Sequence, residues 1–177
     1  MKRIAIDIGH ANKTGARGNG YDEHEMCATL AKAVKAALES YKTQTFTADI
    51  IDFPEKSNTG DLTATVSAIN AGGYDASVSL HMDAASVPTA HGAHVCYTSA
   101  KGKVLANEIA LRLCPQLPGR ANRIVKRDNL YVLKHTNPVA VLVECGFITN
   151  PGDAKWVAEH PDKVALPIAL GIAAFLA

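Results

Sequence analysis

The sequence lacks an excess of charge of either sign and has few aromatic residues. Lys and Arg number 18 against 17 Asp and Glu, which leaves a formal net charge of +1 at pH 7. Such a balance offers no basic surface to a nucleic acid or to an anionic membrane. We therefore expect no nucleic-acid partner and no electrostatic attachment to a membrane.

Long apolar runs and a secretory signal are also missing. The most apolar segment, 164–177, is shorter than the ~20 residues that a membrane-spanning helix needs. The N-terminal segment MKRIAIDIGH carries two basic residues, but Asp7 interrupts an apolar stretch that is already too short for a signal peptide. We expect no membrane insertion, no signal peptide and synthesis in the cytoplasm.

None of the four cysteines belongs to a C-x-x-C pair, which excludes the spacing of a zinc ribbon or a redox motif. Cys27, Cys96, Cys114 and Cys145 are widely separated in the sequence. We interpret them as small buried apolar residues. Two disulfides are the alternative, and they would require an oxidising compartment.

Strand and helix patterns alternate along the chain, with no linker, repeat or low-complexity segment. Runs of β-forming apolar residues predict strands, and apolar residues at i, i+3 and i+4 predict helices. The predicted strands are 2–8, 43–52, 75–81, 92–98, 130–134 and 140–146. The predicted helices are 23–39, with Asp22 as N-cap, 61–71, 100–114, 152–159 and 162–176. This order indicates a single α/β domain around a mostly parallel twisted sheet of about six strands, with helices on both faces.

Polar side chains stand near the carboxyl ends of three predicted strands, where open α/β sheets bind ligands. His10 follows the first strand, and His81 ends a later one. Glu144 lies inside the almost continuously apolar segment AVLVECG, where an ionised carboxylate is costly unless it is paired or bound to a metal. The alternatives are hydrogen-bonded structural histidines, and an ion pair of Glu144 with Lys134 or Arg127.

Two histidines and one carboxylate would supply the three protein ligands of a catalytic zinc site, which leaves a fourth position open for water. The carboxylate must lie near the first turn of the chain. The segment DEHEM offers Asp22, Glu23, His24 and Glu25. Spacing alone does not choose among these four residues.

Several segments resemble the zinc-dependent N-acetylmuramoyl-L-alanine amidases, the family shared by bacterial autolysins and phage endolysins. They run in the family's order over nearly the whole chain. The S-x-H segment together with LVE-x-GF-x-x-N is the most specific part, whereas D-x-G-H alone is a weak motif. The matching segments are IDIGH (6–10), EHEMCATLAKAV (23–34), SLHMDA (79–84), GAHVCY (92–97) and PVAVLVECGFITNPGD (138–153).

The resemblance implies that His10, Glu23 and His81 bind zinc and that Glu144 is the catalytic carboxylate. Glu23 is favoured over its neighbours because the helix that follows it keeps the family's register. Glu25 is then expected to face solvent.

The resemblance leaves the roles of two aspartates near the implied site open. Asp7 precedes His10 by three residues, as in the family, and either supports a metal-binding histidine or bonds to the backbone at the strand end. Asp83 stands where the family usually has Asn, two residues after His81. Its added negative charge leaves open what it contacts, a metal ligand or the substrate.

By this resemblance, residues 1–177 form the catalytic domain of an enzyme that uses Zn²⁺ to hydrolyse the amide between N-acetylmuramic acid and L-alanine in peptidoglycan. Zinc would polarise the amide carbonyl and activate water, and Glu144 would carry a proton from that water to the alanine nitrogen. No separate cell-wall-binding domain is visible, and we expect release to the wall through a phage-type pore. The alternatives are a zinc carboxypeptidase or deacetylase acting on another amide, and a binding module without turnover.

Overall fold

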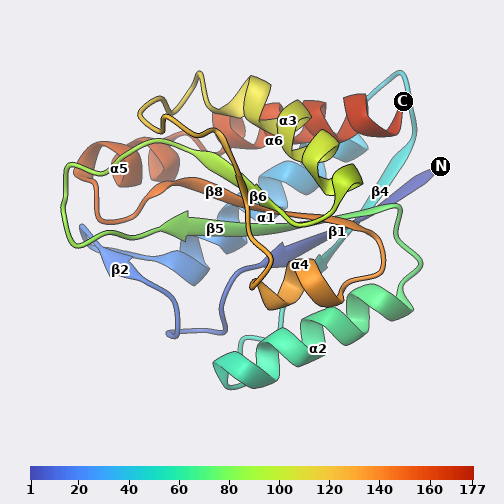
Figure 1. The fold of residues 1–177 in the computed structure, drawn as a ribbon, viewed down its shortest axis with the longest axis horizontal. Helices are drawn as coiled ribbons and strands as arrows, with labels where there is room; N and C mark the ends of the chain where they lie inside the picture. Colours follow the sequence, from blue (N-terminus) through green and yellow to red (C-terminus); the bar gives the residue numbers. More distant parts are fainter.

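A six-stranded sheet forms the centre of the computed structural model, which describes residues 1–177 except for the side chain of Asn58 (Figure 1). Its strand order is β4-β1-β5-β8-β6-β7, and every neighbouring pair is parallel except β6 and β8. The strands are β1 Lys2–Ile8, β4 Phe46–Ile51, β5 Ala76–Asp83, β6 His94–Tyr97, β7 Ile124–Lys126 and β8 Val139–Phe147. A separate short hairpin pairs β2 Arg17–Gly18 with β3 Tyr21–Asp22. The predicted single α/β domain with a mostly parallel sheet is confirmed.

Helices cover both faces of this sheet (Figure 1). One face packs against α1 Glu23–Glu39 and α3 Ala100–Leu113, and α6 Pro161–Leu176 packs against both of these helices. Helix α5 Pro151–Glu159 follows β8 on the chain. The other face carries α2 Asn58–Ala71 and α4 Tyr131–His135. Among the described residues, no helix combines the length and the apolar character that crossing a membrane requires.

The two faces of the sheet differ in polarity because side chains alternate along each strand. On β5, Val78 and Leu80 are fully buried in the large core under α1, α3 and α6. Burying one such side chain contributes about 1.5–3 kcal/mol. The intervening residues Ser79 and His81 face the side of α2 and α4, where the apolar cluster is much smaller. The large core thus holds the fold together and leaves polar groups on the opposite face.

Two predictions between residues 115 and 135 are wrong. The predicted strand 130–134 is the helix α4, and the strand β7 Ile124–Lys126 lies where no strand was predicted. A five-residue apolar run has no periodicity that separates helix from strand. In α4, the Lys134 amide donates to the Leu130 carbonyl at 3.0 Å, and Val132 and Leu133 are buried against the sheet.

Helix boundaries follow their capping residues. The predicted N-cap Asp22 accepts a hydrogen bond from the Glu25 amide at 3.4 Å, and α1 begins at Glu23 as expected. Helix α2 begins three residues before its predicted start because Ser57 caps it by accepting from the Gly60 amide at 3.1 Å. All four cysteines are free and buried, in agreement with their interpretation as apolar residues.

Candidate functional site

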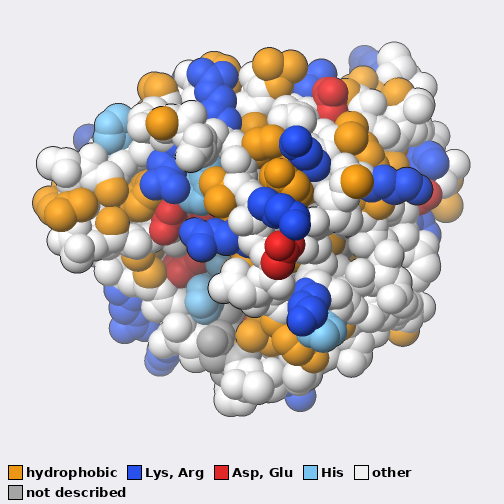
Figure 2. Space-filling view, viewed as in Figure 1, with side chains coloured by type: hydrophobic (Ala, Val, Ile, Leu, Met, Phe, Trp, Pro, Cys, Tyr) orange, Lys and Arg blue, Asp and Glu red, His pale blue; other side chains and the backbone are white. Residues whose placement is uncertain are grey.

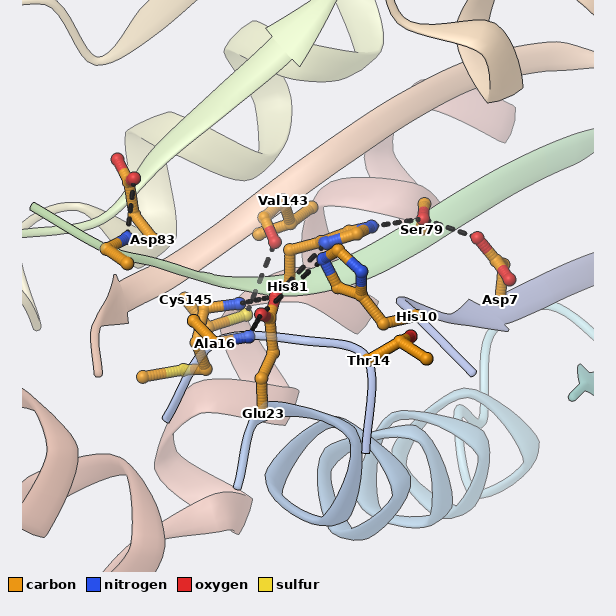
Figure 3. Close-up of polar contacts among 12 residues, drawn as sticks. Asp7, His10, Thr14, Ala16, Glu23, Ser79, His81, Asp83, Val143 and Cys145 are labelled. Atoms are coloured by element: carbon orange, nitrogen blue, oxygen red, sulfur yellow. Dashed lines mark hydrogen bonds and ion pairs between the residues drawn. The ribbon is translucent and has the colours of Figure 1, made fainter. Parts of the chain in front are cut away.

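Glu23 is a buried carboxylate held by backbone amides from two separate segments (Figure 3). The Asp22 cap starts α1 at this residue, so its side chain extends from the helix toward the end of the sheet. Oε2 accepts from the Ala16 amide at 2.7 Å, and Oε1 accepts from the Met82 amide at 3.1 Å. The side chain therefore has a fixed position although it is only 2% exposed.

His81, near the carboxyl end of β5, is held between Glu23 and Ser79. Its Nδ1 lies 3.2 Å from Glu23 Oε1, and its Nε2 lies 3.1 Å from Ser79 Oγ (Figure 3). Because the Ser79 hydroxyl donates to Asp7, Ser79 Oγ accepts its second hydrogen bond from Nε2–H. Nδ1 then faces Glu23: it donates to the carboxylate when His81 is protonated, and it offers its lone pair to a cation when His81 is neutral. Asp7 thus orients a histidine through Ser79, which is one of its two expected roles.

His10 completes the group from the loop after β1. It adopts the left-handed conformation, with φ of 63°, which costs a non-glycine residue about 1–3 kcal/mol. Its Nε2 lies 3.5 Å from Glu23 Oε2, and its ring packs edge-on against that of His81 with centroids 5.0 Å apart. A Cβ at Gly9 would lie only 2.4 Å from His81 Cε1, so this position must be glycine for the two rings to approach.

The arrangement of these three side chains suits a metal ion. The ligand atoms of His10, Glu23 and His81 all lie within 4.8 Å of one another, and they form the only such group among the described residues. Ligands ~2.1 Å from a tetrahedral zinc ion lie about 3.4 Å apart. The two distances from Glu23 oxygens to histidine nitrogens, 3.2 and 3.5 Å, match this spacing. Two imidazoles and one carboxylate are also a donor set that zinc accepts.

Glu23 and His81 each stabilise the ionised form of the other. Burial acts to raise the pKa of Glu23, but the hydrogen bond and charge of His81, with the charge of His10, lower it below the usual value. Burial acts to lower the pKa of His81, but Glu23 and Glu144 raise it above the usual value. Without a metal, a proton on His81 therefore balances the ionised Glu23. A bound cation would take the place of that proton.

Glu144 lies beside His81 because the two residues are partners in the register of β5 and β8. Its Oε2 is buried and has no hydrogen-bond partner among the described residues. Burial raises the pKa of Glu144 to about 7, with His81 opposing this effect and Asp83 adding to it. No ion pair of Glu144 with Lys134 or Arg127 is found among the described side chains, and the charge of Arg127 only acts to lower the pKa of Glu144.

A pocket of about 400 Å³ connects Glu144 with the two histidines. Figure 2 shows acidic and histidine side chains gathered in a hollow over the carboxyl end of β5, with Lys and Arg side chains beside them. The polar residues of the pocket include Asp7, His10, Ser79 and His81, and its apolar wall includes Leu142. The pocket can therefore hold a substrate bond next to the candidate metal ligands.

The other residues that the sequence offered as ligands lie elsewhere. Asp22 pairs with Arg17 besides capping α1, and Glu25 is exposed. His24 lies 3.0 Å from Asp52. Of the four acidic or histidine side chains in DEHEM, the structure brings only Glu23 to the histidines.

The sequence leaves the role of Asp83 open and assigns no role to Ser79. Asp83 accepts from the Ala84 amide at 2.7 Å, and its other oxygen lies 3.9 Å from His94 Nδ1. No hydrogen bond or ion pair joins Asp83 to His81 among the described side chains. Ser79 is the serine of the S-x-H segment. Residues two apart on a strand share one face, so this spacing indicates that the side chains of Ser79 and His81 lie next to each other.

Comparison with known proteins agrees with this geometry. A family described as N-acetylmuramoyl-L-alanine amidase matches residues 4–174. The amidase LytC of Bacillus subtilis is 32% identical over 93% of this chain, which spans about a third (34%) of that protein.

Two solved structures share the fold. The catalytic domain of CD27L, an endolysin targeting Clostridia difficile, has a TM-score of 0.89 and 26% identity, with 98% of each chain covered. The amidase AmiC2 of Nostoc punctiforme has a TM-score of 0.85 and 27% identity, with 99% of this chain and 97% of that chain covered. The protein belongs to the N-acetylmuramoyl-L-alanine amidase family.

Proposed function

We propose that this domain hydrolyses the amide between N-acetylmuramic acid and L-alanine in peptidoglycan, with Zn²⁺ held by His10, Glu23 and His81. The observation that carries the proposal is the convergence of these three ligand atoms beside Glu144. Membership of the amidase family supports the choice of bond.

Bound zinc would polarise the amide carbonyl and make water a better nucleophile at neutral pH. Glu144 then acts as the general base that takes a proton from the attacking water. The same carboxyl returns this proton to the alanine nitrogen as the C–N bond breaks. A pKa of about 7 suits a group that must accept and release a proton near neutrality.

The surrounding residues keep the reacting groups in position. Asp7, through Ser79, holds the His81 ring with Nδ1 toward Glu23. Backbone amides of Ala16 and Met82 restrain Glu23. Such supporting contacts orient metal ligands, and their loss commonly costs 10–100-fold in metal affinity or activity.

The test is the identity of the product. Zinc-loaded protein should release new N-terminal alanine from peptidoglycan, measured by amine labelling and mass spectrometry, and chelation should abolish this release. Released acetate would indicate a deacetylase, and a released C-terminal amino acid would indicate a carboxypeptidase. Either product without new N-terminal alanine would overturn the proposal.

Glu144→Gln tests the assigned base. The variant should keep its zinc, measured by metal analysis, because Glu144 is not among the three grouped ligands. Its turnover should fall by about 10²–10⁴-fold, the usual contribution of general acid–base catalysis. Near-normal turnover in the zinc-loaded variant would contradict the role given to Glu144.

A further inference from the structure

Two polar residues on α2, Asp61 and Thr65, line the pocket without taking part in the chemistry described above. They stand four residues apart, so they share one side of the helix. Asp61 is 3% exposed and Thr65 is 1% exposed. Asp61 Oδ1 and Thr65 Oγ1 have no hydrogen-bond partner among the described residues. Two buried acceptors therefore remain unsatisfied beside the candidate metal site.

The carboxylates in this part of the pocket have no ion-pair partner in the described part of the chain, although Asp7 accepts a hydrogen bond from Ser79. Among the described side chains, neither Asp61 nor Asp7 forms an ion pair, although both line the pocket. Burial raises the pKa of Asp61 to about 6, and the nearby charges of Asp7 and Asp52 add to this effect. Asp52 itself is paired with His24 at 3.0 Å. A buried carboxylate without a partner is destabilising, so a ligand with positive charge would be favoured here.

The start of α2 explains only part of this arrangement. Asp61 lies in the first helical turn, where the helix dipole favours a negative charge by about 0.3–1 kcal/mol. An exposed aspartate would gain the same benefit without desolvation. The dipole also gives no reason for an unpaired Thr65 hydroxyl on the pocket side.

The walls of the pocket indicate what kind of cation fits. Leu62, Leu130 and Val132 line it together with the ring of Tyr131, so the acidic end lies next to apolar surface. Asp7 and Asp61 do not belong to any group of three described side chains that could hold a metal ion. Apolar walls and a small number of acceptors suit an alkyl chain that ends in N–H donors better than a bare metal ion.

We propose that Asp61 and Thr65 form a subsite for a primary ammonium group on an alkyl chain. The subsite rests on the proposed function, because the same pocket would hold the bond to be cleaved and the ammonium group would belong to the substrate's peptide. The free side-chain amine of a diamino acid in an uncross-linked peptide has this chemistry. Its N–H groups would donate to Asp61 Oδ1 and Thr65 Oγ1, and the Asp7 carboxylate would add to the attraction.

The experiment measures binding of n-butylammonium to zinc-loaded protein by calorimetry or saturation-transfer NMR, with n-butanol as the neutral isostere. We expect n-butylammonium to bind at least tenfold more tightly than n-butanol. Asp61→Asn should remove this preference, and Thr65→Val should weaken ammonium binding several-fold. Glu55→Gln, which removes an exposed acidic charge outside the pocket, should bind like the unmodified protein. Equal binding of the two probes, or an unchanged preference in Asp61→Asn, would overturn the subsite.

A tethered amine provides a second test of the proposed position. Thr65→Lys adds an alkyl chain with a terminal ammonium group at a position that lines the pocket, so the folded variant should no longer bind n-butylammonium. A folded Thr65→Lys variant that still binds the probe normally would contradict the proposed position.

Amide cleavage measured on the same preparations separates the two proposals. Release of N-terminal alanine without ammonium preference overturns the subsite alone. Ammonium preference without alanine release leaves the cation site in place and overturns the proposed amidase function.

Discussion

Substitution of Gly9 by alanine tests whether close packing in the loop after β1 controls metal binding. A Cβ at this position would lie 2.4–2.6 Å from three ring atoms of His81. The ring would have to move by about 1 Å to reach ordinary van der Waals separation. Gly9 is not among the residues with positive φ, so alanine introduces no backbone strain there. The substitution therefore acts on His81 rather than on the fold.

A displacement of about 1 Å in a site of this kind can cost about 100-fold. We therefore expect Gly9→Ala to weaken zinc binding by about 100-fold, or about 2.8 kcal/mol, measured by competition with a chromogenic chelator. The melting temperature of the metal-free protein should change little. Gly152→Ala is the matched control, because its only close neighbour is Asn150 Oδ1 at 3.2 Å. Unchanged zinc affinity in a folded Gly9→Ala protein would refute the reasoning.

Three further predictions concern the carboxylates and the serine of the site. Glu23→Gln should reduce zinc affinity by more than 100-fold, whereas Glu25→Gln, two residues further along, should bind zinc normally; the reverse result would assign the ligand to Glu25. Ser79→Ala should lower zinc affinity by about 10–100-fold because His81 loses its link to Asp7, while Ser77→Ala on the same strand should not. In metal-free protein, the pKa of Glu144 is raised from 4.5 to about 7, so the folded state binds the extra proton and stability should fall as the pH rises through this range. Glu144→Gln should flatten that part of the melting-temperature profile, and an unaltered profile would contradict the raised pKa.

The sequence was sufficient to predict the parts of the fold that depend on local patterns. Helix α1 has a capping aspartate and an apolar stripe, and β8 is almost continuously apolar. Segments 124–126 and 130–134 could not be assigned in this way. Their structures depend on whether a strand such as β6 is available for pairing and on what covers the sheet face.

The candidate site was predictable only where local sequence patterns place its residues. His81 and Glu144 could be placed because both stand near the ends of recognisable strands. The third ligand could not be chosen from the residues alone, since four adjacent polar side chains compete for the role. The choice depends on the path of the loop before α1, where the Ala16 amide comes within 2.7 Å of Glu23 Oε2. No sequence pattern indicates a role for Asp61 and Thr65, because only the packing of α2 on the sheet buries them.

The shared register of β5 and β8 has a consequence for how this domain could diversify or be engineered. His81 and Glu144 are cross-strand neighbours, so their separation is set by the backbone hydrogen bonds of the sheet. Part of the pocket wall, Asn129 and Leu130, lies on the loop between β7 and α4, outside this ladder. This loop could therefore be exchanged to change what enters the pocket, while the distance between Glu144 and His81 stays constant.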